Sequence, residues 1–327
     1  MSRYILSSCL VVLSVLFAFS GTATGEVLFS DNFNNAGTPA DPDYGLNANL
    51  SGRLGGYIGS GMTTAWGLDQ WSSAGSMRVN ETTGDWNGAD AMVAQFTGTG
   101  AHHGAIIQHN FNKSYIADGG YFTVYFDFTP VYSADAASST FVVGGISIGG
   151  KDGTLSTLPS GTGGGPGRFD PNSDVAFSIL GGYTGNVAAA KATFAGLGNA
   201  GTWVGFDDEP GTITAPKTYQ FKLTVTLTDN SFAEGANASA NLQWYDNDSN
   251  WTSVDVNGAD AGTDVTWQWD ADGNNYICFF EHLQSGKIQY SKFDNVQIFG
   301  EVPEPSTLAL LACGLVGLLA YAWRKRK

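Results

Sequence analysis

The sequence predicts an all-β protein built on a single antiparallel β-sandwich, with an apolar helix at each end of the chain. Apolar and polar residues alternate with a period of two along several segments, which is typical of strands with one face in a core and one in water. Glycine is frequent, with 44 of 327 residues, and only 14% of residues are charged. This composition favours many strands joined by turns, so we expect about a dozen or more strands within residues 26–300.

Residues 1–25 have the layout of a secretory signal peptide. Arg3 precedes an apolar run over residues 5–19, and small residues lead to Gly25. A basic start, an apolar centre and small residues before the cleavage point predict export, with cleavage near Gly25. A lipoprotein signal at Cys9 is the weaker alternative, because most of the apolar run follows that cysteine.

The alternation is clearest over residues 219–227, where every second side chain is apolar. Further candidate strands cover residues 122–128, 175–180, 240–245, 276–281 and 293–299. Clusters of Gly, Asp, Asn and Ser between them predict turns, and no segment of 26–300 has the period of an amphipathic helix. Trp267 and Trp269 share a face with Val265, so we expect them in the core. Cys278 alternates within an apolar strand, which predicts a buried and inert thiol.

The end of the chain has three parts in a fixed order. Pro303, Glu304 and Pro305 precede an uncharged apolar segment over residues 307–323, and a basic cluster of Arg324, Lys325, Arg326 and Lys327 ends the chain. As a helix, the apolar segment reaches roughly 26 Å, enough for a thin bilayer. The cations keep the C-terminus in the cytoplasm, so residues 301–327 predict one transmembrane helix with the sandwich facing outward.

This tail resembles the PEP-CTERM sorting signal of Gram-negative bacteria. The resemblance implies recognition at the inner membrane by an exosortase-type sorting machinery and cleavage near Pro303–Glu304–Pro305. It implies a protein that is anchored by the C-terminal helix before processing and is then at the cell surface or extracellular, in a host that makes exopolysaccharide. An ordinary single-span anchor is the alternative.

The two ends of the predicted sandwich are similar to those of concanavalin A-like, or laminin G-like, jelly rolls. The domain opens with Leu-Phe-Ser-Asp-Asn-Phe at 28–33 and closes with Phe-Asp-Asn-Val-Gln-Ile at 293–298. The resemblance implies that the first and last strands lie side by side. It implies a fold and says almost nothing about function.

A carbohydrate-active hydrolase is one alternative, because family 16 glucanases share the jelly-roll shape. Retaining chemistry needs two carboxyls about 5 to 5.5 Å apart, which a strand supplies at spacings of two or four residues. No glutamates of the domain have that spacing, and residues 207–209 before Pro210–Gly211 are interpreted as a turn. We therefore expect no catalytic residues, although an inverting pair brought together by folding stays open.

Calcium is the metal that the sequence favours. Asp31 and Asp294 share strand parity with apolar neighbours, so both carboxylates are expected to face the core at the ends of adjacent strands. Such a carboxylate needs either a cation or N–H donors. Turn capping by Asp is the alternative. His102, His103 and His109 lack the spacing of a zinc site.

Sugar binding needs exposed aromatic faces beside hydrogen-bonding side chains. Four tryptophans lie in polar, turn-rich contexts and are the candidate ligand-binding residues: Trp66, Trp71, Trp86 and Trp251. Packing over an end of the sandwich is the alternative for each of them.

The net charge of −15 argues against nucleic-acid binding, which requires cations along the phosphate backbone. We interpret the protein as an exported cell-surface component of the envelope or exopolysaccharide layer, binding or structural and non-catalytic, and associated with carbohydrate. The alternatives are a hydrolase on the same scaffold and a passive matrix protein that has no specific ligand and no groove lined by tryptophan.

Overall fold

The computed structural model describes most strands of the domain and the turns between some of them. The described residues are 26–31, 33, 48–49, 54–58, 62–70, 75–79, 92–96, 101–111, 120–130, 142–150, 173–183, 187–194, 204–207, 211–212, 215–229, 231–256, 264–270, 274–283 and 291–300. The predicted signal peptide at 1–25 and the predicted transmembrane helix at 307–323 lie outside them. Within the described ranges, no helix is long and apolar enough to cross a membrane.

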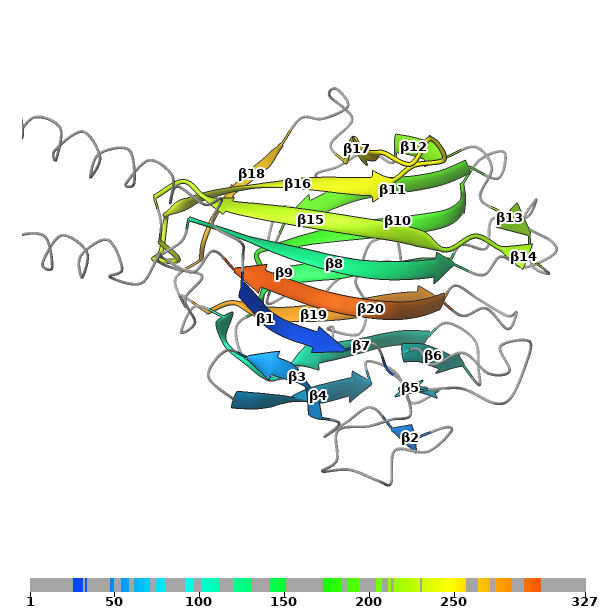
Figure 1. Cartoon of the computed structure of the whole chain (residues 1–327), viewed down its shortest axis with the longest axis horizontal. Helices are drawn as coiled ribbons and strands as arrows, with labels where there is room; N and C mark the ends of the chain where they lie inside the picture. The colour runs from blue at the N-terminus through cyan, green and yellow to red at the C-terminus, as the bar shows by residue number, and fades with distance from the viewer. Residues whose placement is uncertain are drawn as a thin grey trace, which may run out of the picture.

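Two antiparallel sheets lie face to face (Figure 1). In the ten-stranded sheet the order is β17 (Trp251–Ser253), β16 (Asn237–Tyr245), β15 (Tyr219–Leu227), β8 (Tyr121–Pro130), β20 (Ser291–Gly300), β6 (Met92–Phe96), β5 (Gly75–Val79) and β2 (Ala48–Asn49), with β1 (Glu26–Asp31) beside β20 and β18 (Val265–Gln268) beside β16. In the eight-stranded sheet the order is β12 (Val204–Asp207), β11 (Val187–Phe194), β10 (Val175–Tyr183), β9 (Val142–Gly150), β19 (Tyr276–Leu283), β7 (Ala101–Ile107), β4 (Met62–Gln70) and β3 (Leu54–Ile58). A short ribbon pairs β13 (Gly211–Thr212) with β14 (Ala215–Pro216). The predicted all-β jelly-roll sandwich is confirmed.

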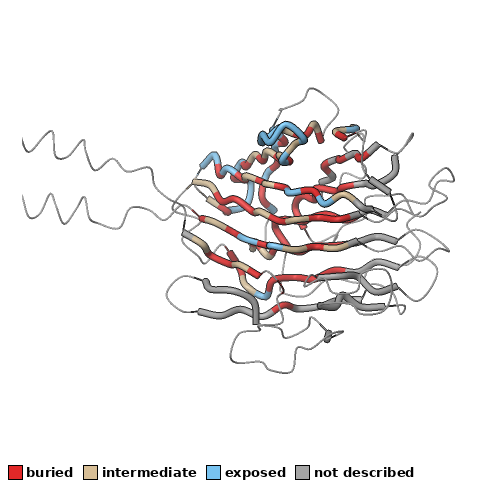
Figure 2. Tube along the Cα trace, turned by 45° about the vertical axis from the view of Figure 1, so that its right-hand side comes forward, coloured by how far each residue is buried: buried red, intermediate tan, exposed pale blue. Residues whose placement is uncertain are grey.

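The core lies between the sheets, and buried residues alternate with less buried ones along the strands, as Figure 2 shows. Phe126 of β8 meets Phe279 of β19 across the two layers, with ring centroids 5.6 Å apart. The sheets approach so closely that a Cβ atom at Gly144 of β9 would lie 2.3 Å from the Phe128 ring. Only glycine fits there without displacing that ring.

Three residues that the sequence assigned to the core are buried. Trp267 is 8% exposed and Trp269 is 2% exposed, both on the inner side of the ten-stranded sheet. Cys278 of β19 is buried, and its thiol donates to the backbone carbonyl of Phe279 at 3.3 Å. The predicted burial of all three residues is therefore confirmed.

The two terminal strands lie side by side, as expected. β1 pairs antiparallel with β20, and Asp31 lies opposite Val296. The Asp31 carboxylate accepts hydrogen bonds from the backbone N–H of Phe33, at 2.7 Å, and from Nε1–H of Trp66, at 2.8 Å. Because Trp66 belongs to β4 of the other sheet, this bond links the first strand to the opposite layer.

A bulge in β20 corrects one prediction. The register with β8 gains one residue between Asp294 and Gln297, and Asn295 in that interval has a positive φ of 49°. The extra residue lets Phe293 and Val296 both face the core. Asp294 therefore shares the outer face of the sheet with Asp127, its partner on β8. The predicted inward direction of Asp294 is wrong, because parity does not persist through a bulge.

Trp66→Phe should destabilise the fold, because it leaves a buried carboxylate oxygen of Asp31 without its indole donor. The expected loss is about 1.5–3 kcal/mol in the free energy of unfolding, measured by urea denaturation. Trp269→Phe is the matched control, since its buried Nε1–H finds no acceptor in the described part of the chain. Equal losses in the two variants would show that the bond to Asp31 contributes nothing.

Candidate functional site

Aromatic side chains gather on the outer face of the ten-stranded sheet. Ring centroids of Phe299 and Tyr125 are 5.4 Å apart, those of Tyr125 and Trp251 are 5.8 Å apart, and those of Trp251 and Tyr245 are 5.4 Å apart. We call these four residues the aromatic row. Trp251 is 37% exposed and Tyr245 is 40% exposed, and they are the two exposed large apolar side chains of the described residues. Exposed aromatic rings that touch one another are typical of a binding surface.

The indole of Trp251 lies over the sheet instead of projecting from its edge. Its strand, β17, is separated from β8 by β16 and β15, and neighbouring strands are about 4.8 Å apart. Trp251 nevertheless reaches Tyr125 of β8, so the indole lies across the two strands between them. Lys222 of β15 places Nζ 5.5 Å from the centroid of the Trp251 ring, within cation–π range.

A hollow of about 280 Å³ adjoins one end of the row. Its lining comes from outward side chains of β8 and β20: Tyr121, Thr123, Tyr125, Gln297 and Phe299. Three aromatic rings supply apolar walls, while the hydroxyls and the Gln297 amide supply donors and acceptors. Burial raises the pKa of the Tyr125 hydroxyl, which stays protonated and able to donate at neutral pH. The hollow thus combines apolar surface with uncharged hydrogen-bonding groups.

A carboxylate shapes the turn that leads into Trp251. Oδ1 of Asp246 accepts the backbone N–H groups of Asp248, at 3.0 Å, and Asn250, at 2.9 Å, and the hydroxyl of Thr252 donates to Oδ2. These bonds, that of Thr252 first, lower the pKa of Asp246. The turn before β17 is therefore held by a charged acceptor on both sides of Trp251.

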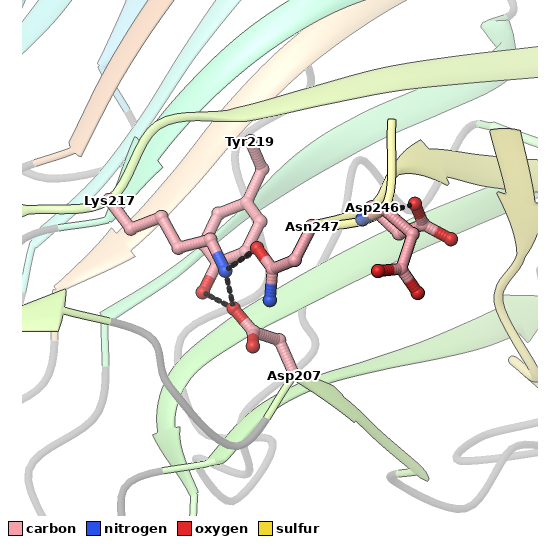
Figure 3. Close-up of polar contacts among 6 residues, drawn as sticks. Asp207, Lys217, Tyr219, Asp246 and Asn247 are labelled. Carbon is pink, nitrogen blue, oxygen red and sulfur yellow. Dashed lines mark hydrogen bonds and ion pairs between the residues drawn. The ribbon is translucent and has the colours of Figure 1, made fainter. Parts of the chain in front are cut away.

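A second polar cluster ties the same turn to the sandwich (Figure 3). Nζ of Lys217 donates to Oδ2 of Asp207 and to Oδ1 of Asn247, the latter at 2.9 Å. The Tyr219 hydroxyl also donates to Asp207 Oδ2, at 2.8 Å, and Asp207 is buried. Removing one member of a buried ion pair leaves a charge without compensation, so this cluster fixes β12, β15 and the turn relative to one another.

The sequence interpretation missed the Asp207 cluster. It placed residues 207–209 in a turn, whereas Asp207 is the last residue of β12. Lys217 lies ten positions further along the chain. In strands, that spacing does not predict a contact between two side chains. No sequence signal pairs these two residues, because the contact depends on how β12 and β15 approach in space.

The four candidate tryptophans have different outcomes. Trp251 lies in the aromatic row, although its ligand stays a prediction. Trp66 is fully buried and holds Asp31, so its assignment to a surface binding site is wrong. Trp71 and Trp86 lie outside the described residues.

The candidate calcium pair does not converge. The Asp31 carboxylate lies inside the sandwich with N–H donors, while Asp294 lies on the outer face and accepts the backbone N–H of Asn295 at 2.7 Å. In the described ranges, no group of three or more His, Cys, Asp or Glu side chains could hold a metal ion.

Most residues of the site were not singled out from the sequence. The alternation over 122–128 already directed Thr123 and Tyr125 outward, and an outward tyrosine on a strand is a signal that could have been followed. Gln297 and Phe299 gave no such signal. They join the site because Gln297 lies opposite Tyr125, and Phe299 opposite Thr123, in the register of β20 with β8.

Comparison with known families and structures addresses the tail and the fold. Residues 301–327 match the family model described as the PEP-CTERM protein-sorting motif. The chain carries a PEP-CTERM sorting motif. This confirms the resemblance noted in the sequence. No curated protein matches the chain.

Solved structures similar to this chain include several lectin domains. The metal-free carbohydrate recognition domain of Emp46p is 10% identical, with 72% of this chain and 87% of that chain covered and a TM-score of 0.40. A Bacillus subtilis protein with a galectin-like fold is 12% identical, with coverages of 73% and 90% and a TM-score of 0.38. Peanut lectin is 11% identical, with coverages of 71% and 90% and a TM-score of 0.40. The strand pairing within the chain itself establishes the two-sheet arrangement.

The environment of Asp127 on the outer face predicts that wild type and Asp127→Asn differ in stability by an amount that depends on pH. Burial raises its pKa, while the 2.7 Å hydrogen bond from Asn295 Nδ2 and the charge of Lys292 oppose that rise. A raised folded-state pKa means that the stability from this carboxyl is present below the unfolded value and is lost as pH rises through the folded value. Asp127→Asn should therefore raise the melting temperature at pH 7. The gain in the free energy of unfolding should be no more than about 1 kcal/mol, because water screens the half-exposed group.

The gain should shrink as pH falls toward about 4, the ordinary value for Asp, in a series of thermal melts. Asp246→Asn is the contrasting control. Its folded-state pKa is lowered, so its carboxylate stabilises the fold above the unfolded pKa and this contribution is lost as pH falls through the folded value. That variant should melt lower than wild type at pH 7. A lower melting temperature for Asp127→Asn at pH 7 would contradict the burial argument.

Proposed function

We propose that this protein is an exported, non-catalytic component of the cell surface whose sandwich binds polysaccharide through the aromatic row and the adjoining hollow. One observation carries the proposal: Trp251 is exposed and in contact with Tyr125, which also lines a hollow with aromatic walls and uncharged polar groups. A pyranose has an apolar face and a rim of hydroxyls, and this surface offers a partner to each.

Export and sorting form the other half of the proposal. The signal-peptide pattern of residues 1–25 directs the chain to the secretory route, and the sorting motif at 301–327 supplies the C-terminal signal. The apolar segment 307–323 holds the protein in the inner membrane until an exosortase-type enzyme cleaves near Pro303–Glu304–Pro305. The released sandwich then stays at the cell surface or in the exopolysaccharide.

The affinity for a single sugar unit should be low. Stacking on one aromatic face contributes only about 0.5–1.5 kcal/mol beyond the area that it buries, and association costs several kcal/mol in lost freedom. Dissociation constants from about micromolar to millimolar are the reasonable range. Weak individual contacts suit a matrix protein, because a polymer offers many copies of the same unit.

A hydrolase would need two carboxyls facing a bound sugar. Asp127 and Asp294 are partners across β8 and β20, but neither belongs to the lining of the hollow. Their surroundings on the outer face favour a structural interpretation, with Asn295 donating to both carboxylates.

Removal of the tail is the first expectation. Mass spectrometry of protein extracted from the surface of the producing cells should detect peptides of the sandwich and no peptide from Leu308 onward. The reason is that the proposed cleavage near Pro303–Glu304–Pro305 comes before the apolar segment, which would then be left behind in the membrane. Protein that always extends to Lys327 would indicate a permanent single-span anchor.

Trp251→Ala should weaken polysaccharide retention without lowering the melting temperature, because the side chain is partly exposed and outside the core. Losing one stacking face should weaken binding roughly 5- to 30-fold, measured by affinity electrophoresis of the full chain in a mild detergent. Thr266→Ala is the matched control on the same face, since Thr266 lies opposite Ser239, about 20 Å along β16 from Tyr245.

Two results would contradict this expectation in different ways. Equal retention of wild type and Trp251→Ala would favour a passive matrix protein. Release of reducing ends from a polysaccharide, lost on replacing Asp127 or Asp294, would make the protein a hydrolase.

A further inference from the structure

We propose that the site takes an uncharged, extended polysaccharide whose chain runs across the strands, with successive sugar rings on the hollow and the aromatic row. This inference rests on the proposed function and names the ligand class for the same site. Three features of the outer face carry it: its charge balance, the spacing of its rings and the chemistry of its polar groups.

The outer face is electrically balanced although the chain is strongly acidic. Its charged side chains, among those that the structure describes on this sheet, are Lys222, Lys292, Asp127 and Asp294, so the formal charges cancel. The whole chain carries −15. A polyanionic glycan would be repelled by the chain as a whole and, among the side chains that the structure describes, would meet one lysine, Lys222, at the row. On the described strands of this face a polycation would find as many lysines as carboxylates, and the Asp246 carboxylate in the turn before Trp251 is already bound by two backbone N–H groups and the Thr252 hydroxyl. The ligand that suits this face is uncharged.

The polar groups of the face are hydroxyls and amides. Those on the described strands that face outward include Thr123, Gln220, Thr224, Thr226, Asn237, Ser239, Asn241, Gln243, Ser253, Thr266, Gln268 and Gln297. Hydroxyls and amides both donate and accept hydrogen bonds, as sugar hydroxyls do, and they require no counter-ion. Near the hollow, Thr123 and Gln297 put such groups directly beside aromatic walls.

The row is long enough for more than one sugar. Its three successive ring spacings of 5.4, 5.8 and 5.4 Å are close to the length of one pyranose unit in an extended chain. The interplanar angles of 84°, 72° and 62° show that no ring of the row is stacked flat on the next. In such edge-to-face contacts one ring presents its edge to the other, and the exposed parts of Trp251 and Tyr245 stay available to a chain that crosses β20, β8, β15 and β16.

Affinity electrophoresis of the full chain in a non-ionic detergent tests the ligand class. The gels contain either a neutral polysaccharide (hydroxyethylcellulose, glucomannan or dextran) or a polyanion (alginate or chondroitin sulfate). We expect retardation by at least one neutral polymer and none by the polyanions. We also expect retardation to change less than about twofold between roughly 0.02 and 0.5 M NaCl, since screening affects only charged partners.

Chain length tests the crossing geometry. Titration calorimetry with oligosaccharides of the polymer that binds best should give a tetrasaccharide at least about tenfold tighter than the monosaccharide, because each further ring face adds a contact. Trp251→Ala should remove most of that gain in affinity. Gln297→Ala should weaken the binding of both ligands, while Thr266→Ala should bind both as wild type does.

The outcomes separate this inference from the proposed function. Retardation by alginate or chondroitin sulfate that is lost at high salt would show that the ligand is charged. The inference of an uncharged ligand would then be wrong, while the proposed binding of polysaccharide would stand. Equal affinities for monosaccharide and tetrasaccharide would overturn the crossing geometry. Retardation by no polymer of either kind would remove the proposed function itself, and with it this inference.

Discussion

The structure depends on a layer of aromatic side chains that two sheets must bury between them. Phe126 contacts Phe221 within its own sheet and Phe279 of the opposite sheet, while Gly144 leaves room for the Phe128 ring. Burial of apolar area is the main favourable term in folding, so these inward residues determine which way every strand faces. The outward residues do not contribute to this core, so their side chains can be selected for contact with a ligand.

The same constraint explains the bulge in β20. Phe293 and Val296 lie three positions apart, and a regular strand would send one of them to water. One extra residue, with the left-handed backbone at Asn295, lets both remain in the core. After the bulge, Gln297 and Phe299 point outward beside β8. The bulge that keeps Phe293 and Val296 in the core therefore also places Gln297 and Phe299 in the wall of the hollow, on the opposite face of the sheet.

Polar interactions act mainly at the rim, where they position the aromatic row. Asp246 holds the turn before Trp251, and Lys217 joins that turn to the buried Asp207. Because a fixed side chain loses less entropy on binding, an indole held by its turn suits recognition of a weakly bound polymer. The face is balanced in charge on an acidic chain, so repulsion between copies of the protein can coexist with contact to an uncharged partner.

The sequence by itself determined the features that depend on local order. Alternation with a period of two identified the sandwich, Val265 identified Trp267 and Trp269 as core, and the order of Pro-Glu-Pro, apolar segment and basic cluster identified the sorting motif. Only the tertiary structure decided which candidates meet. It buried Trp66 against Asp31, turned Asp294 outward, and brought Tyr125, Trp251 and Phe299 together from distant strands. The physical reason is that alternation assigns a side chain to a face, whereas neighbours across a sheet depend on register, bulges and strand order.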